Sequence, residues 1–248
     1  MEKQTTSLHK VTLAFLLSFF ISFSGIIPVK ASSGTSAAVE TDTPYRAESF
    51  PLSGGGSLDV KTSGGHITVE GTSSNTVRVE MYVRRKGRDL TPDEIHLDDW
   101  EIDISKSGKS IKAMAKYKGK RWNFFGNGDH PSISFIVYTP RTMSSKLNTD
   151  GGHITIKGLS GDQQMRTSGG HLVLSDLEGN IEARTSGGHI TAGDLQGNFN
   201  ARTSGGHIDL NNIRGVVEAQ TSGGNIEADF ISLASSTDLK TSGGNIDI

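Results

Sequence analysis

The sequence predicts an all-β protein whose larger part is a parallel β-solenoid of 18-residue, two-strand coils. Three observations support this prediction. A seven-residue motif ending in Gly-Gly-His-Ile or a close variant returns at 18-residue intervals between residues 148 and 226. Apolar and polar residues alternate inside each copy, which is the period of a strand. Glycine supplies 31 of the 248 residues, as expected for many short strands joined by tight corners.

Each copy holds one strand after its glycine pair, a glycine-containing turn, and a second strand before the next Thr-Ser-Gly-Gly. One copy buries only a single line of apolar residues, so copies must stack to form a core. Stacking places equivalent residues in columns about 4.8 Å apart. Three inward columns are expected: Ile154, Leu172, Ile190, Ile208, Ile226 and Ile246; Leu159, Leu177, Leu195 and Ile213; and Ala183, Ala201 and Ala219.

The Thr-Ser-Gly-Gly segment is predicted to be a corner. The two glycines are expected there because they tolerate positive φ. The threonine is expected at the last inward position, where its hydroxyl can bond along the stack. The fifth copy has two extra residues, which predicts a bulge near Ser235 and Ser236.

Residues 1–31 have the layout of a secretory signal peptide. Lys3 and Lys10 precede an apolar run over 11–27, and small residues precede a cleavage point after Ala31. The alternative is a membrane anchor, for which the run is short and contains several serines. The chain contains no cysteine, which excludes disulfides and lipid attachment at cysteine. An exported protein is expected, periplasmic, cell-surface or secreted.

Four segments are expected in total: the signal peptide, a flexible linker over 32–49, a β-rich part over 50–140 and the solenoid repeats over 141–248. The β-rich part carries a detached motif copy at 61–67. A capping box formed by Thr91 and Glu94, with Pro92 between them, predicts one short helix within 90–100. A hairpin around Ser107 and Gly108 and a strand over 132–140 follow.

The net charge and the motifs argue against several classes of function. Cleavage after Ala31 removes three lysines and one glutamate, leaving 22 basic and 26 acidic residues, a net charge of −4. This argues against a nucleic-acid binder, and no second apolar run predicts a transmembrane segment. No serine-nucleophile, P-loop or dinucleotide motif is present. Asp176, Asp194 and Asn212 share one column that could bind calcium weakly. We therefore expect no enzyme and no cofactor.

The chain resembles a bacterial family of candidate adhesins, also called the DUF4097 domain. The resemblance is carried by GGSLDVKTSGGHITVEG, by FIVYTP leading into LNTDGGHITIKGLSG, and by the repeated TSGG[HN]I that follows. It covers about residues 50–248. It implies an exported β-solenoid and no catalytic residues, and it says little about the ligand.

Histidines occupy one outward column: His153, His171, His189 and His207. Neutral imidazole is a common ligand of zinc, copper and nickel, and imidazole also titrates near neutral pH. Three interpretations stay open: a solvent-exposed slot that tolerates histidine or asparagine, a weak metal-binding stripe, or a pH-sensitive face.

Two further features are candidate binding sites. Arg166, Arg184 and Arg202 form a column that is either a solvated face with ion pairs to Glu182 and Glu218 or a strip for an anionic polymer such as a sulfated glycan, teichoic acid or lipopolysaccharide. Trp122, Phe124 and Phe125 lie among basic residues and suit a glycan, a lipid headgroup or a partner protein, or else they cap the solenoid.

These observations predict a non-catalytic binding module of the cell envelope or the exterior, with an adhesin-like role and a repetitive ligand such as a polysaccharide. The alternatives are a scaffold that self-associates end to end and a carbohydrate-active enzyme. Sedimentation at several concentrations tests the first alternative. New chain ends in a polysaccharide digest test the second.

Overall fold

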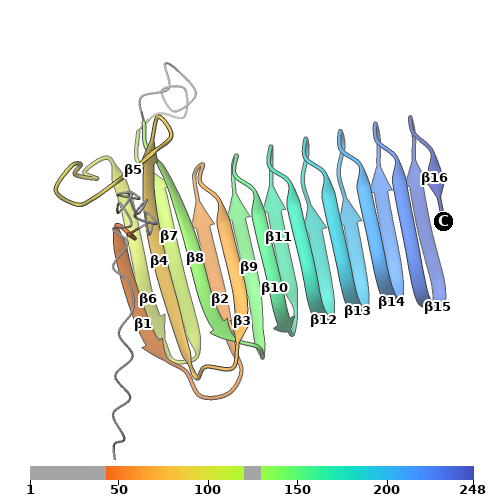
Figure 1. Ribbon diagram of the computed structural model, residues 1–248, viewed down its shortest axis with the longest axis horizontal. Helices are drawn as coiled ribbons and strands as arrows, with labels where there is room; N and C mark the ends of the chain where they lie inside the picture. Colours follow the sequence, from red (N-terminus) through yellow and green to blue (C-terminus); the bar gives the residue numbers. More distant parts are fainter. Residues whose placement is uncertain (1–42, 120–129) are drawn as a thin grey trace, which may run out of the picture. The chain divides into compact units, whose positions relative to one another are not determined.

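The computed structural model describes residues 43–119 and 130–248, which lie within one compact unit. Within these ranges the protein is all β, with sixteen strands in one mixed sheet and no helix (Figure 1). The all-β prediction is confirmed. The strands are β1 (Arg46–Pro51), β2 (Gly56–Thr62), β3 (Ile67–Thr72), β4 (Thr76–Arg85), β5 (Arg88–Leu90), β6 (Trp100–Ser107), β7 (Ser110–Tyr117), β8 (Ser132–Pro140), β9 (Met143–Thr149), β10 (Ile154–Ser160), β11 (Gln163–Thr167), β12 (Leu172–Arg184), β13 (Ile190–Arg202), β14 (Ile208–Thr221), β15 (Ile226–Thr241) and β16 (Ile246–Asp247).

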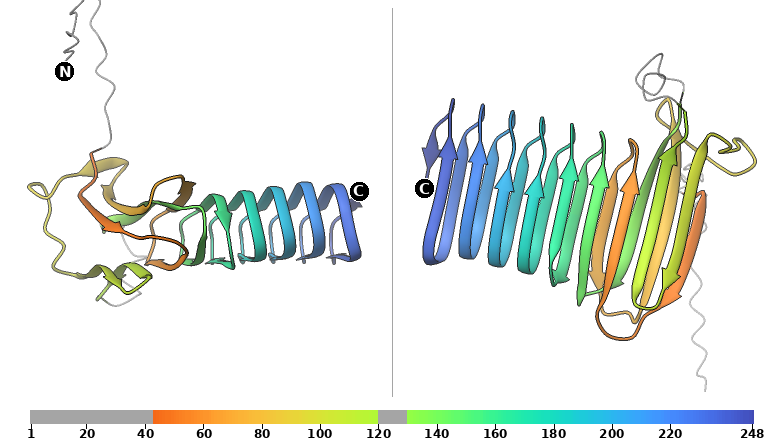
Figure 2. Two further views of the ribbon diagram at one scale, coloured as in Figure 1. Left: turned by 90° about the horizontal axis from the view of Figure 1, so that it is seen from below. Right: turned by 180° about the vertical axis from the view of Figure 1, so that it is seen from behind.

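The repeat region is a parallel ladder with an 18-residue register. Ile154 pairs with Leu172, Leu172 with Ile190, Ile190 with Ile208, and Ile208 with Ile226. Each repeat is therefore one turn of the chain lying on the previous turn, as the two views in Figure 2 show. We call each such turn a coil.

The expected turn in the middle of each repeat is a bend inside one strand. β12, β13 and β14 each run through it without a break, whereas β10 and β11 are separate strands as expected. In β12 the bend uses Asp176 at φ 53° and Gly179 at φ 127°. The pairing skips Asp176 and resumes at Leu177, so the chain changes direction and the ladder continues.

The detached motif copy joins the same ladder. β2 pairs in parallel with β9, and β3 pairs in parallel with β10, with Val60 opposite Leu147 and Ile67 opposite Ile154. β2 and β3 thus form the coil that precedes the first repeat, and the strands β4 to β8 are an insertion between coils.

The inserted strands are mostly antiparallel. β4 lies between β1 and β8, and β6 and β7 form the predicted hairpin, with Gly108 at φ 58° in its turn. β8 is the predicted strand over 132–140, and it pairs in parallel with β3. β1 begins at Arg46, inside the segment expected to be a linker, because its residues pair with β4.

The short helix predicted within 90–100 is wrong. The capping bonds form: the Thr91 N–H donates to the Glu94 carboxylate (2.8 Å), and the Glu94 N–H donates to the Thr91 carbonyl (3.0 Å). The Thr91 N–H and then Arg88 hold the pKa of the Glu94 carboxyl below its usual range. These bonds close one turn at Thr91. The next turn is separate and is closed by the Trp100 N–H, which donates to the Leu97 carbonyl. Two isolated turns do not make the continuous hydrogen-bond series of a helix.

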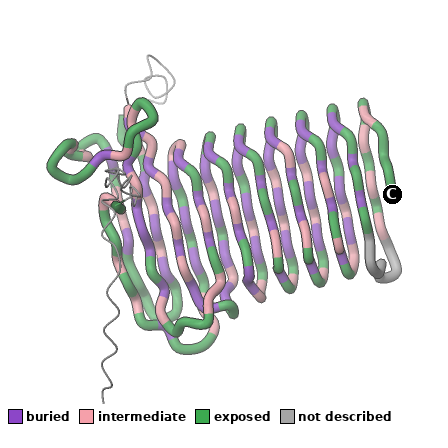
Figure 3. The backbone as a smooth tube through the Cα atoms, viewed as in Figure 1, coloured by how far each residue is buried: buried purple, intermediate pink, exposed green. Residues whose placement is uncertain are grey.

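The core follows the predicted columns. The isoleucine and leucine column is at most 1% exposed from Ile67 to Ile226, and the second column and the alanines are also buried (Figure 3). Ile246 is the exception at 39% exposed, since β16 pairs only with β15 among the described strands. The predicted bulge is confirmed in the backbone pairing, which jumps on β15 from Leu233 to Thr237.

Several expectations fall outside the described residues: the signal peptide over 1–31, most of the linker, and Trp122, Phe124 and Phe125. Within the described residues, no helix is long and apolar enough to cross a membrane.

Candidate binding surfaces of the repeats

The corner of each coil is held by its buried threonine. The Thr185 hydroxyl donates to the Gly170 carbonyl of the preceding coil (2.9 Å) and accepts from the Gly188 N–H of its own corner (3.2 Å). The same pair of bonds recurs at Thr149, Thr167, Thr203 and Thr221. The prediction of an inward threonine that bonds along the stack is confirmed.

The glycine pair has a different purpose from the one predicted. Neither Gly187 nor Gly188 has positive φ. A Cβ on Gly188 would lie 1.9 Å from the carbonyl oxygen of Gly170, whereas one on Gly187 would have no neighbour nearer than 3.7 Å. The second glycine is thus required because two main chains approach too closely for any side chain.

The histidines bond to the main chain of the neighbouring coil. Nδ1 of His171 accepts the N–H of His189 (2.8 Å), and Nδ1 of His189 accepts the N–H of His207 (2.8 Å). The series starts with Ser134, whose hydroxyl accepts the His66 N–H, and it ends where Nδ1 of His207 accepts the N–H of Asn225. We call the surface that carries His66, His153, His171, His189, His207, Asn225 and Asn245 the histidine face.

Asparagine replaces histidine without loss of this bond. Oδ1 of Asn225 accepts the N–H of Asn245 at 3.0 Å, in the place that Nδ1 takes elsewhere. Both side chains put an acceptor at the same distance from the backbone, which explains why the slot holds only these two residue types at its seven positions.

The imidazole rings stack on one another. Their centroids are 4.8–5.0 Å apart with interplanar angles of 6–10°, from His66 to His207. Nδ1 accepts a main-chain N–H, so the proton of the neutral ring is on Nε2, which can donate it to an external acceptor. Within the described ranges, no group of three or more His, Cys, Asp or Glu side chains is placed to hold a metal ion. The four predicted histidines line a shallow groove of about 620 Å³ with Thr155, Val173, Thr191 and Asp209.

The arginine column lies beside carboxylates. Glu182 lies 2.9 Å from Arg166 and 2.6 Å from Arg184, and Glu218 lies 2.5 Å from Arg202. Burial works to raise the pKa of the Glu182 carboxyl, but bonds from Gln164 and Arg166 and the charge of Arg184 hold it below its usual range. The structure therefore has the ion pairs of the solvated-face interpretation, and the positive charge of the column is largely compensated.

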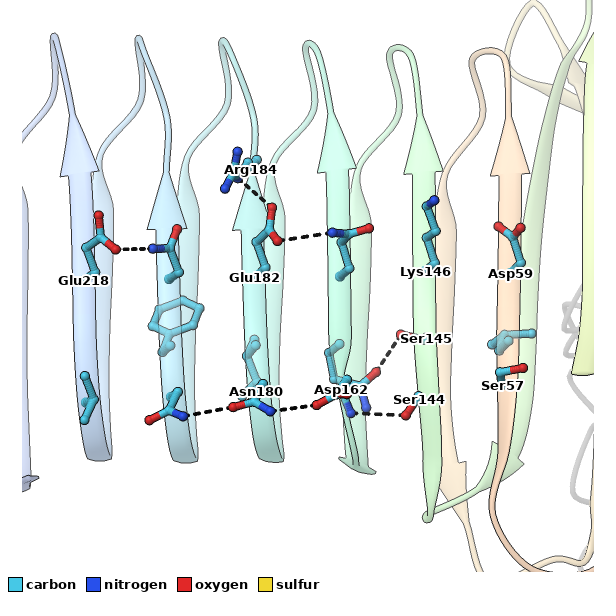
Figure 4. A pocket seen from close by; sticks show the side chains of 18 of the residues that line it. Ser57, Asp59, Ser144, Ser145, Lys146, Asp162, Asn180, Glu182, Arg184 and Glu218 are labelled. Atoms are coloured by element: carbon cyan, nitrogen blue, oxygen red, sulfur yellow. Dashed lines mark hydrogen bonds and ion pairs between the residues drawn. The ribbon is translucent and has the colours of Figure 1, made fainter.

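A row of polar residues runs beside the arginines, one residue from each strand. In register order it contains Lys112, Asp59, Lys146, Gln164, Glu182, Asn200, Glu218 and Asp238. A second row runs parallel to it, in which Asn180 donates to Asp162 and Asn198 donates to Asn180, each at 2.9 Å (Figure 4). We call the surface with these two rows and the arginine column the arginine face.

The two rows line a groove of about 850 Å³ that crosses several coils. Its acidic residues are Asp59, Asp162, Glu182 and Glu218, and its basic residues are Lys146 and Arg184. The histidines line a different groove from the one that contains these residues.

Sequence reasoning missed His66 as a member of the histidine column and missed the Asn and Gln rows. The motif at 61–67 was a sufficient signal for His66, but the inserted strands hid which coil it joins. The side chains of the column formed by Asp176, Asp194 and Asn212 already bond within the protein. Asp176 accepts from Arg141 (2.8 Å), and Asp194 accepts from Asn212.

No family model matches the chain, and neither does any curated protein. Among solved structures, it is similar to a candidate adhesin from Bacteroides fragilis (14% identity, 82% of this chain and 96% of the other, TM-score 0.44). It is also similar to a candidate cell adhesion protein from Clostridium sporogenes (11%, 83% and 99%, 0.37) and a candidate lipid binding protein from Parabacteroides distasonis (16%, 82% and 96%, 0.39). Similarity at this level transfers no function to the chain.

Proposed function

We propose that the protein is a non-catalytic, exported, adhesin-like module of the cell envelope or the exterior. In this proposal the parallel coils form a β-solenoid of the DUF4097 kind, and the arginine face binds a polysaccharide. The observation that carries the proposal is the groove of about 850 Å³ lined by two polar rows, the first of which contributes one polar residue from each coil. A surface that presents one polar side chain at each strand spacing, about 4.8 Å, suits a ligand that is itself repetitive.

The groove chemistry favours an uncharged polysaccharide over an anionic one. Amide and carboxylate groups in the rows are acceptors and donors for sugar hydroxyls. Four carboxylates against two basic side chains give the groove a net negative charge. The arginines that could attract a polyanion are paired with Glu182 and Glu218.

The same carboxylates argue for binding over catalysis. Glycoside hydrolysis commonly needs one carboxylic acid whose pKa is raised so that it can donate a proton. The pKa of the Glu182 carboxyl is instead lowered, and Glu218 holds both Arg202 and Asn200. Asp162 accepts from Asn180.

The test is calorimetric titration of residues 32–248 with neutral oligosaccharides of increasing length and with acidic polymers of matched length. We expect affinity for the neutral series to rise with length until the groove is spanned, and weaker binding of the acidic series. No binding at any length would overturn the proposal, and new reducing ends in the mixture would replace it with an enzymatic function.

A matched pair of variants locates the site. Asn180→Ala with Asn198→Ala removes two exposed groups of the second row, whose loss costs little stability. Thr155→Ala with Thr191→Ala removes two groups from the groove of the histidine face. We expect the first variant to lose affinity and the second to bind like the natural protein.

A further inference from the structure

The histidine face couples successive coils through hydrogen bonds that depend on the charge of the imidazole. Five rings each accept a main-chain N–H at Nδ1, at 2.8–3.0 Å. A neutral imidazole can do this only with its proton on Nε2. A protonated imidazole carries an N–H at both nitrogens and has no acceptor left.

Protonation therefore turns each of these contacts from donor–acceptor into donor–donor. It also places like charges on rings whose centroids are 4.8–5.0 Å apart, and like charges repel. The asparagine step from Asn225 to Asn245 has the same geometry and cannot be protonated in this pH range. The column thus contains both an acid-sensitive form of the bond and an insensitive one.

The charged groups around the column are few. At one end, burial and then the charges of His153 and Arg84 lower the pKa of His66. Asp209 lines the histidine groove near the other end, and Glu227 lies opposite it in the backbone register of the next coil. Between these ends the neighbouring outward residues are Thr155, Val173 and Thr191, which carry no charge.

We propose that the histidine column is a proton-sensitive device that loosens the coil corners on this face when the surroundings become mildly acidic. An unperturbed histidine titrates near pH 6.5. In this pH range an imidazole of the unfolded or locally opened chain binds a proton freely. In the folded chain the same imidazole can bind a proton at Nδ1 only after its hydrogen bond to the main-chain N–H has broken. Because protonation removes the Nδ1 acceptor, we expect these bonds to be intact at neutral pH and to weaken in mild acid.

The arginine face is expected to stay intact over the same range. Its bonds join side chains, and the pKa of the Glu182 carboxyl lies below its usual range, so this group remains ionised in mild acid. The proposed loosening is therefore local and affects one side of each coil.

The experiment is residue-resolved amide hydrogen exchange on residues 32–248 at about pH 7 and about pH 5.5, expressed as protection factors so that the intrinsic pH dependence cancels. The amides of His171, His189, His207 and Asn225 should each lose roughly tenfold in protection in acid, the equivalent of one hydrogen bond. The amide of Asn245, bonded to Asn225, should not change.

The matched variant replaces the five histidines by asparagine: H66N, H153N, H171N, H189N and H207N. It keeps His96 and His130, so any sensitivity due to them remains. We expect this variant to fold, because asparagine supplies the same acceptor, and to lose the acid effect. Retained protection in the natural protein at about pH 5.5, or equal loss in the variant, would overturn the proposal.

A single substitution gives a second test if the fivefold variant does not fold. In His189→Asn only the bond to the N–H of His207 changes its acceptor. The His207 amide alone should then lose its acid sensitivity, while the amides of His171 and of residue 189 keep theirs. The proposal would be contradicted if the acid sensitivity were lost at every amide of the column or at none of them.

Discussion

The histidine face and the arginine face use the same 18-residue repetition in different ways. On the histidine face each outward side chain bonds to the main chain of the next coil, as Nδ1 of His171 does to the N–H of His189. On the arginine face the outward side chains bond to one another, as Arg202 does to Glu218. A conspicuous column of identical residues can therefore be part of the scaffold, while a less regular row of mixed polar residues is the surface that we propose for the ligand.

The largest expected effect lies at the corner beside the histidines. Gly188→Ala places a Cβ 1.9 Å from the Gly170 carbonyl oxygen, which neither main chain can avoid without breaking the ladder. We expect a loss of about 3 kcal/mol or more in the free energy of unfolding, or failure to fold. Urea denaturation measures it.

Gly187→Ala is the control for this prediction. Its Cβ would meet nothing nearer than 3.7 Å, so the change should cost little. Equal losses in the two variants would show that conformational freedom, and not close approach, is what the glycine pair provides.

The next effect is expected at the corner threonine. Thr185→Val preserves shape but removes the hydroxyl that donates to Gly170 and accepts from Gly188. Two buried main-chain groups lose their partner, which should cost about 2 kcal/mol. Thr185→Ser keeps the hydroxyl, and its midpoint urea concentration should lie much nearer to that of the natural protein.

A smaller loss of stability is expected at the histidines, where two substitutions separate the contribution of the hydrogen-bond acceptor from that of the stacked ring. His189→Ala leaves the His207 N–H without its partner and should cost about 1 kcal/mol at neutral pH. His189→Asn should change the free energy of unfolding by less than about half of that. If asparagine were as costly as alanine, ring stacking and not the hydrogen bond would be the contribution of the column.

The smallest effect is expected on the arginine face. Arg202→Gln removes a solvent-exposed ion pair with Glu218, and such pairs contribute about 0–1 kcal/mol. Thermal unfolding at low and at high salt checks this. A loss that persists at high salt and exceeds that of His189→Ala would reverse the contrast between the two faces.

The columns could be predicted from the sequence because period-two alternation and an 18-residue repeat determine which side chains face inward. The burial of Leu177, Ala201 and Ile208 follows from that pattern alone. The corner threonine was also predictable, since a buried hydroxyl in a stack has a main-chain carbonyl within reach of each copy.

Other features depended on distances that no pattern contains. The second glycine is required by the approach of two main chains, and the role of histidine depends on which ring nitrogen meets the next N–H. The turn at Thr91 has the bonds of a helix start, but the segment after it lacks the length to propagate one. The polar groove combines residues from β2, β9, β11 and later strands, whose neighbourhood is visible only after the insertion between coils is placed.

The most direct test of the contrast is one binding experiment on three proteins at neutral pH. The natural protein, the variant with Asn180→Ala and Asn198→Ala, and the fivefold histidine-to-asparagine variant are titrated with the neutral oligosaccharide that the length series selects. We predict that the histidine variant binds like the natural protein and that the Asn180 and Asn198 variant loses most of its affinity. Loss of binding in the histidine variant with full binding in the other would contradict the account and make the histidine face the ligand site.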